Sequence, residues 1–180
     1  HLIDIGAESS RASAARVGVS EQERALIPVI EELSSTGVVV SVESYDPDVA
    51  AVGLKAGSRV LNLTGSALDD EMFELAASHG ASAVLCNVLG AHARDLDGTT
   101  VEADPVPKLI DRFGERIQRA RELGVASVAI DPGLGFGFSL DDQRARAKYQ
   151  AVTLLHSFRL RALGVPICHA LPHAFDYFED

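Results

Sequence analysis

The chain has 180 residues, 47% of them hydrophobic, which suits one domain covering residues 1–180 with a sizeable core. Its net charge of −10 argues against a nucleic-acid partner, because phosphate binding relies on clustered basic residues. No apolar run approaches the roughly 20 residues of a membrane span, so no membrane partner is expected. Two cysteines make no disulfide framework, and we expect a cytoplasmic protein. The start at His1, immediately before an apolar segment, suggests a fragment of a longer chain.

Six short apolar segments recur along the chain as expected for β-strands. They cover residues 2–5, 38–42, 60–63, 83–86, 125–130 and 165–168. The segment at 38–42 is almost entirely β-branched, which is typical of a strand buried on both faces. Strands that alternate with longer helical patterns imply right-handed βαβ units and a parallel sheet. An open doubly wound sheet and a closed barrel both fit this pattern, although no dinucleotide-binding glycine fingerprint is present.

Helical patterns fill the intervals between these strands. The first helix is expected to open with a capping box of Ser20 and Glu23, and Gly37 would end it. The second begins at Asp46, which a proline follows at the first helical position. The third is expected to open at Ser66.

The second half of the chain predicts two longer helices. One has an apolar stripe from Leu109 to Ala120, and its polar side, which we expect to face solvent, carries Arg112, Arg116 and Arg119. The other is expected to run from about Ser139 to about Leu163.

Polar side chains lie at the ends of all six predicted strands. In chain order they are Glu8, Ser9, Ser10, Arg11, Glu43, Asn62, Asn87, Asp131, His169 and His173. Parallel sheets and barrels bind ligands at the carboxyl ends of their strands. A carboxylate there can accept two hydrogen bonds from a ring edge that carries an exocyclic amine beside a ring N–H. The pattern therefore favours an aminopyrimidine-like ring over a sugar phosphate.

The sixth strand end also has the residue types of a metal site. His169 and His173 are spaced by four, and Cys168 precedes them. Pro172 lies between the histidines and argues against the regular helix that would align them. We therefore expect these residues to line a pocket and assign no metal ligands.

Three segments carry a resemblance to a known family. Asp4–Arg11 is similar to the pattern Asp-Ile-Gly-Gly-Glu-Ser-Thr-Arg, and Ser41–Tyr45 is similar to Ser-Val-Asp-Thr-Tyr. Asp131–Gly137 is nearly Asp-Pro-Gly-Ile-Gly-Phe-Gly. These motifs, in order from residue 2 to about 137, resemble the dihydropteroate synthase family. The resemblance implies an α/β fold, a TIM (β/α)8 barrel of the pterin-binding type, here lacking the first strand and the last βα unit.

The resemblance also implies a function. Such enzymes are transferases that condense 7,8-dihydropterin pyrophosphate with 4-aminobenzoate in folate biosynthesis, with Mg²⁺ neutralising the departing pyrophosphate. Carried over, the catalytic residues are Asp131, Asn62 and Glu43. The implied substrate contacts are Ser10 and Arg11, toward the aminobenzoate or pyrophosphate region, together with Cys86, Asn87, Phe136 and His173. A homodimer is also implied.

Several residues depart from the family pattern, mainly where the reaction would occur. Glu43 replaces an aspartate, and Asn87 stands at a usual histidine. In place of the family's Ser-Arg-Lys, the last segment reads Cys168 to Phe175, with Pro172 at the arginine position and His173 at the lysine position. The alternative is a pterin-binding paralogue without synthase activity. It would be either like the pterin-dependent methyltransferases or a non-catalytic binding protein.

Overall fold

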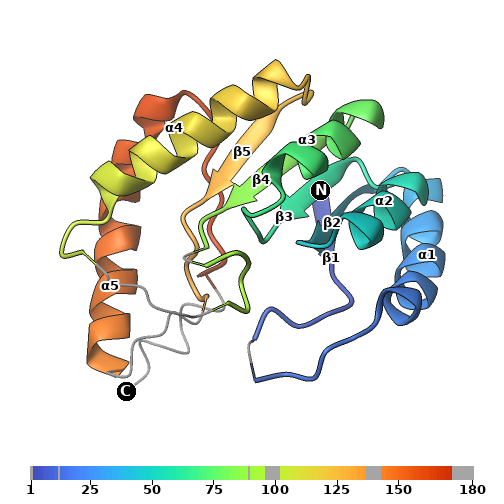
Figure 1. The fold of residues 1–180 in the computed structure, drawn as a ribbon, viewed down its shortest axis with the longest axis horizontal. Coiled ribbons are helices and arrows are strands. Elements are labelled where there is room, and N and C mark those ends of the chain that lie inside the picture. The colour runs from blue at the N-terminus through green and yellow to red at the C-terminus, as the bar shows by residue number, and fades with distance from the viewer. Residues whose placement is uncertain (1, 12, 89, 96–101, 137–142, 172–180) are drawn as a thin grey trace.

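The computed structural model describes residues 2–11, 13–88, 90–95, 102–136 and 143–171. Five strands form one parallel sheet in chain order: β1 (Leu2–Ile5), β2 (Val39–Ser44), β3 (Val60–Leu63), β4 (Ser82–Cys86) and β5 (Val128–Asp131). The helices are α1 (Val19–Ser35), α2 (Pro47–Lys55), α3 (Asp69–Ser78), α4 (Val106–Glu122) and α5 (Gln143–His156), followed by the 3₁₀ helix η1 (Ser157–Leu163). The strands lie side by side at the centre and the helices lie outside them (Figure 1).

The sixth predicted strand is reduced to a single parallel bridge between Ile130 and Ile167. The Ile130 amide donates to Pro166 O (3.0 Å), and the Cys168 amide donates to Ile130 O (2.7 Å). Pro166 has no N–H to extend the ladder. The segment nevertheless occupies the position next to β5, where a further barrel strand belongs.

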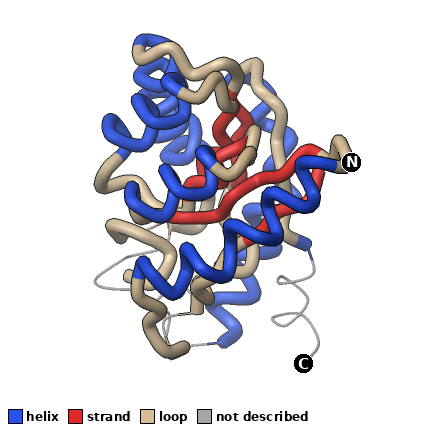
Figure 2. Tube along the Cα trace, turned by 90° about the vertical axis from the view of Figure 1, so that its right-hand side faces the viewer, coloured by secondary structure: helices blue, strands red, loops and turns tan. Residues whose placement is uncertain are grey.

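The two faces of the sheet differ in polarity because side chains alternate along each strand. The outer face is apolar: Val42 packs so closely under α2 that a Cβ on Gly53 would lie 2.5 Å from it. Parallel register places Glu43 opposite Asn62 and Cys86 opposite Asp131 on the other, inner face. Seen from the side of α1, helices lie across the outside of the strands (Figure 2).

The core between sheet and helices contains several large side chains with almost no exposed surface. They are Leu26, Ile30, Leu61, Leu63, Met72, Phe73, Leu85, Phe113 and Ile130. Burying each contributes roughly 1.5–3 kcal/mol relative to leaving it exposed. This one core fixes the strands whose ends carry the polar residues.

Two of the three predicted helix starts differ from expectation. The N-cap of α1 is Gly18, which forms no side-chain cap, so the capping box of Ser20 and Glu23 is wrong. Helix α3 begins after Leu68, and the Ser66 amide instead donates to the backbone at residue 91. The start of α2 is confirmed, because the Asp46 side chain accepts from the Asp48 amide at 2.9 Å.

The later helices also correct the sequence-based picture. Arg116 is only 7% exposed, although α4 was expected to keep its arginines in solvent. Arg112 is also drawn inward and donates to Asn87 Oδ1 and Val88 O, whereas Arg119 remains well exposed. The buried carbonyls at the end of β4 need donors, and these arginines supply them. The final helix was expected to continue to about Leu163, but η1 takes over from α5 after His156. Its expected start near Ser139 lies outside the described residues.

Candidate functional site

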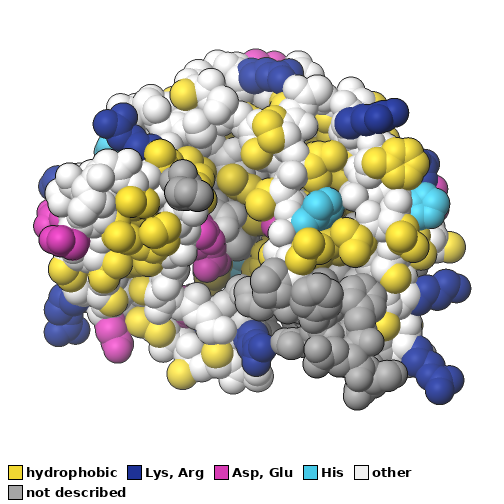
Figure 3. Space-filling view, turned by 180° about the vertical axis from the view of Figure 1, so that it is seen from behind, with side chains coloured by type: hydrophobic (Ala, Val, Ile, Leu, Met, Phe, Trp, Pro, Cys, Tyr) yellow, Lys and Arg dark blue, Asp and Glu magenta, His cyan; other side chains and the backbone are white. Residues whose placement is uncertain are grey.

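Five side chains project from the inner face of the sheet near its carboxyl edge, and we call Asp4, Glu43, Asn62, Cys86 and Asp131 the inner cluster. Asn62 is its centre: its Nδ2 donates to Asp4 Oδ2 at 2.9 Å, and its Oδ1 accepts from the Cys86 thiol at 3.1 Å. These two bonds fix which way the carboxamide points and leave one amide hydrogen and one lone pair available. Acidic side chains lie in a hollow between apolar walls in Figure 3.

Asp131 is buried at the end of β5. Burial raises the pKa of its carboxyl to about 6, the negative charge of Asp4 adds to this, and the Gly133 amide opposes it by donating to Oδ1 at 2.7 Å. Gly133 has φ +84°, and a Cβ there would lie 2.4 Å from Asn87 O. The turn after β5 therefore requires glycine, and that turn holds the carboxylate.

Glu43 is mostly buried at the end of β2. Its Oε1 accepts from the Thr64 hydroxyl at 2.9 Å. Burial raises its pKa to about 7, and repulsion from Asp4 and Glu8 acts in the same direction. Gly6 makes room for this side chain, since a Cβ at that position would lie 2.5 Å from Glu43 Oε2.

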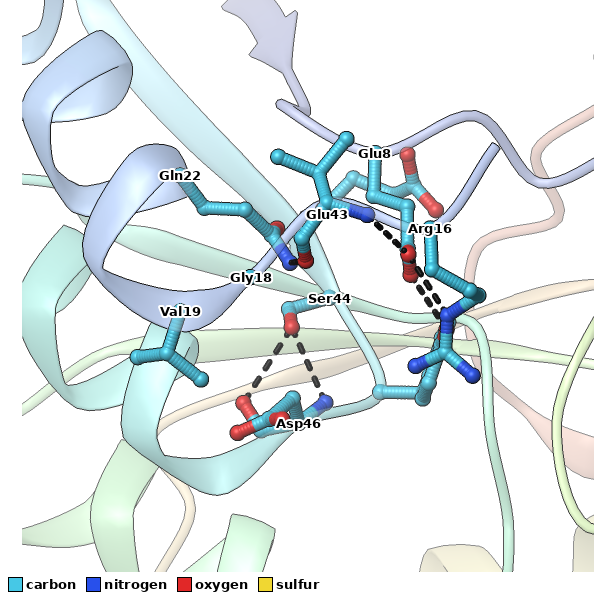
Figure 4. Close-up of a pocket in the computed structure, with 10 residues that line it drawn as sticks. Glu8, Arg16, Gly18, Val19, Gln22, Glu43, Ser44 and Asp46 are labelled. Carbon is cyan, nitrogen blue, oxygen red and sulfur yellow. Dashed lines mark hydrogen bonds and ion pairs between the residues drawn. The ribbon is translucent and has the colours of Figure 1, made fainter. Parts of the chain in front are cut away.

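The first loop, defined as residues 6–11 and 13–18, lies beside the end of β2. Between them is a cavity of about 210 Å³ with Glu43 in its lining. Glu8 accepts through Oε1 from Arg16 Nε (2.7 Å) and the Val17 amide (2.9 Å), and the Tyr45 hydroxyl donates to its Oε2. Figure 4 shows Glu8 and Arg16 pointing toward one another. Burial opposes ionisation of Glu8, but the hydrogen bonds from Tyr45, Val17 and Arg16 lower its pKa overall.

The remaining predicted substrate contacts fall in different places. Ser10 is half-buried and Arg11 exposed on the first loop, and Phe136 is partly buried beyond the Gly133 turn. Asn87 is fully buried, donating to Pro132 O at 3.3 Å and accepting from Arg112 at 3.0 Å. Its carboxamide is thus bonded within the protein and lies outside the inner cluster, and its expected substrate contact stays a prediction.

His173 lies outside the described residues, so its expected contact stays a prediction. Asp4, in contrast, was not assigned a role from the sequence, yet it bonds Asn62 and repels both other acids of the cluster. The signal was present, because an acid between apolar residues in a short strand must face the polar side.

In the described part of the chain, no three His, Cys, Asp or Glu side chains are grouped so that they could hold a metal ion. His169 Nδ1 is buried with no hydrogen-bond partner, and burial lowers the pKa of the ring.

Among the described helices, none is both long and apolar enough to cross a bilayer.

The fold and the inner cluster together define a class of protein. A parallel sheet with helices outside, and with carboxylates and an amide on its inner face near the strand ends, is the wall of a β/α barrel, a fold whose ligand sites lie at the carboxyl ends of the strands.

The family of this barrel follows from comparison with known proteins. The model of the family described as pterin binding enzyme matches residues 1–171, and the chain belongs to that family. The chain is 34% identical over 172 residues to a probable bifunctional folylpolyglutamate synthase/dihydropteroate synthase of Haloferax volcanii, covering 92% of this chain and 19% of the relative. It is 34% identical over 149 residues to the dihydropteroate synthase of Bacillus subtilis, covering 81% and 50%.

Solved structures agree with this assignment. Dihydropteroate synthase from Thermus thermophilus in complex with 4-aminobenzoate matches with a TM-score of 0.79 and 32% identity, covering 93% of this chain and 62% of that one. The same enzyme in complex with 6HMPPP gives a TM-score of 0.77 and 30% identity, covering 93% and 60%. The expected pterin-binding barrel class is confirmed, and this chain spans less than two thirds of the length of these relatives.

Proposed function

We propose that this chain forms the pterin-binding part of a dihydropteroate synthase of folate biosynthesis. The observation that carries the proposal is the inner cluster, in which Asn62 is oriented by Asp4 and Cys86 beside the buried Asp131. The similarity to synthases solved with 4-aminobenzoate and 6HMPPP supports it.

The chemistry of the cluster suits a pterin ring edge. With a pKa of about 6, Asp131 is mostly ionised at neutral pH and can accept from an exocyclic amine and the adjacent ring N–H together. The free amide hydrogen and lone pair of Asn62 would satisfy further ring atoms. Each group is already placed before the ligand arrives, which keeps the cost of ordering low.

The reaction proposed is a substitution at the carbon that joins the pterin to its pyrophosphate. The C–O bond breaks and pyrophosphate leaves with the electron pair, while the amine nitrogen of 4-aminobenzoate forms the new C–N bond and loses a proton. Positive charge develops on the pterin as the leaving group departs. The carboxylates of Asp4, Glu43 and Asp131 would stabilise that charge through a field that exists before the reaction.

Mg²⁺, a cytoplasmic location and a homodimer belong to this proposal through the family resemblance. Mg²⁺ would supply charge neutralisation at pyrophosphate. The acids of the inner cluster are not grouped as a metal site among the described residues, so we derive no step through the ion.

The test is a calorimetric titration of the complete protein with 7,8-dihydropterin pyrophosphate, followed by a pyrophosphate-release assay with 4-aminobenzoate. Asp131→Asn should weaken pterin binding roughly 10- to 100-fold, because a charged acceptor is lost. Asp111→Asn, at an exposed carboxyl on α4, is the matched control and should bind normally. Equal affinity of the two variants would contradict the proposed grip on the pterin.

A second function, pterin binding without synthesis, is favoured by the segment next to β5. By the resemblance, Pro172 and His173 stand at the arginine and lysine positions of the family's Ser-Arg-Lys segment, and the sequence from residue 165 to residue 175 contains no Lys or Arg. Tight pterin binding without pyrophosphate release would support this alternative. Binding of a corrinoid protein would then identify a methyltransferase.

A further inference from the structure

The first loop is fastened from across the sheet by one arginine. Arg94, in the connection between β4 and α4, donates from Nη1 to Ser9 O and from Nη2 to Ala14 O, both at 2.6 Å. The two carbonyls bracket the part of the loop that carries Ser10 and Arg11. One guanidinium thus spans the segment expected to contact substrate.

Arg94 is itself held in place by the backbone before it. Residues 91–93 pair antiparallel with the end of β3, through a bridge between Gly65 and His92 and a 2.8 Å bond from the Ala93 amide to Thr64 O. Thr64 also donates its hydroxyl to Glu43. The contact of Arg94 with the first loop, which we call the clamp, is therefore anchored at the end of β3. Thr64, at the same strand end, also supports Glu43 of the inner cluster.

A second attachment lies beside the first. The ring of His92 stacks on Tyr45 with centroids 4.3 Å apart and planes 18° from parallel. Tyr45 in turn donates to Glu8 on the first loop. The loop is thus attached at Glu8 as well as at the two carbonyls that Arg94 bonds.

We propose that Arg94 is a positioning residue for the second substrate, the arylamine, and this rests on the function proposed above. By bonding the carbonyls of Ser9 and Ala14, it restricts the backbone that presents Ser10 and Arg11. Its fork-shaped group reaches two acceptors at once, which a lysine ammonium cannot do with the same geometry. The pterin site on the inner face uses other residues and does not depend on this contact.

Loss of Arg94 should therefore affect the two substrates differently. Arg94→Ala removes two charge-assisted bonds, so the loop must be ordered by the substrate itself. The KM for 4-aminobenzoate should rise about tenfold or more, whereas pterin affinity should stay within about twofold. Arg94→Lys should recover only part of the loss.

The experiment combines two measurements on the complete protein, with Arg119→Ala as control. Like Arg94, Arg119 donates two hydrogen bonds, but its acceptor is the Asp70 carboxylate. This contact lies on an exposed face away from the first loop. Hydrogen exchange in the free protein should be on the order of tenfold faster for the amides of residues 9–17 in Arg94→Ala, and unchanged in the control. Steady-state kinetics then give KM and kcat for each substrate.

Each outcome bears on one part of the inference. Unchanged exchange in Arg94→Ala would overturn the clamp whatever the protein binds. Faster exchange with an unchanged KM for 4-aminobenzoate would show a purely structural contact and overturn the positioning role. A wild-type protein that neither binds pterin nor releases pyrophosphate would remove the proposed function and, with it, the role toward the arylamine. Faster exchange with a selective rise in that KM, partly rescued by lysine, supports the proposal.

Discussion

Arg116 offers the sharpest test of how the strand ends are held. It lies on α4 and is 7% exposed. It donates to both carboxylate oxygens of Asp69 at 2.7 and 2.8 Å, to Cys86 O at 2.8 Å and to Gly65 O at 2.8 Å. One side chain thus joins α4 to the start of α3, the end of β4 and the β3–α3 connection.

The cost of removing it can be worked out from these contacts. Arg116→Ala leaves the mostly buried Asp69 carboxylate without its partner and two backbone carbonyls without a donor. Breaking a buried pair in this way typically costs about 3–5 kcal/mol, because the remaining charge stays desolvated. We expect a loss in that range, a large fraction of the stability of a domain.

Urea unfolding of Arg116→Ala, with Arg119→Ala alongside, measures this loss. Arg119 is on the same helix and pairs with Asp70 in solvent, so its removal should change stability little. The double variant Arg116→Ala/Asp69→Ala should recover part of the loss, since no unpaired charge then remains. If the Arg116 and Arg119 variants lost equal amounts, the buried network would contribute little and the reasoning would be refuted.

Two further predictions follow from burial and packing. Because the pKa of Glu43 is raised to about 7, its contribution to stability is fully present below its unfolded pKa near 4.5 and is lost as pH rises toward 7. Urea unfolding at both ends of that range should show that the free energy of unfolding of the wild-type protein falls with pH by on the order of 3 kcal/mol, and that Glu43→Gln removes this fall. An equal fall in the wild-type protein and in Glu43→Gln would refute the prediction. Gly53→Ala should cost about 1–3 kcal/mol, since its Cβ would lie 2.5 Å from Val42. In contrast, Gly114→Ala, whose nearest new contact is 3.9 Å away, should gain from helix propensity, and a stable Gly53→Ala protein would contradict this packing.

The strands were predictable because their signal is local. Segments such as residues 38–42 are β-branched, and their observed bounds, Val39–Ser44, differ from expectation by one or two residues. The choice between an open sheet and a barrel was not local, and only the motif resemblance decided it. Two helix starts were wrong for a related reason. For example, Gly18 is the N-cap of α1 without a side-chain hydrogen bond, and no local pattern marks it.

The site was predictable where alternation along a strand governs it. Asn62 and Asp131 project to the same face, because the register places Asn62 beside Val84 and Asp131 beside Cys86, and Val84 and Cys86 share one face of β4. The same alternation places Asn87 outside the inner cluster. Asn87 directly follows the inward-facing Cys86 and so must point to the opposite face. The burial of Arg116 could not be read from its helix, because the carbonyls that attract it lie 30 and 51 residues away in sequence.

The inner cluster is unfavourable to the protein while no ligand is bound. The charges that act on Glu43 and Asp131 are those of other acids: Asp4 on both, and Glu8 on Glu43. Burial and like charges both disfavour ionisation, so this face gains most from a ligand that brings N–H donors or positive charge. An anion would meet only repulsion there. The electrostatics therefore favour a donor-rich heterocycle on the inner face and disfavour any anionic leaving group there.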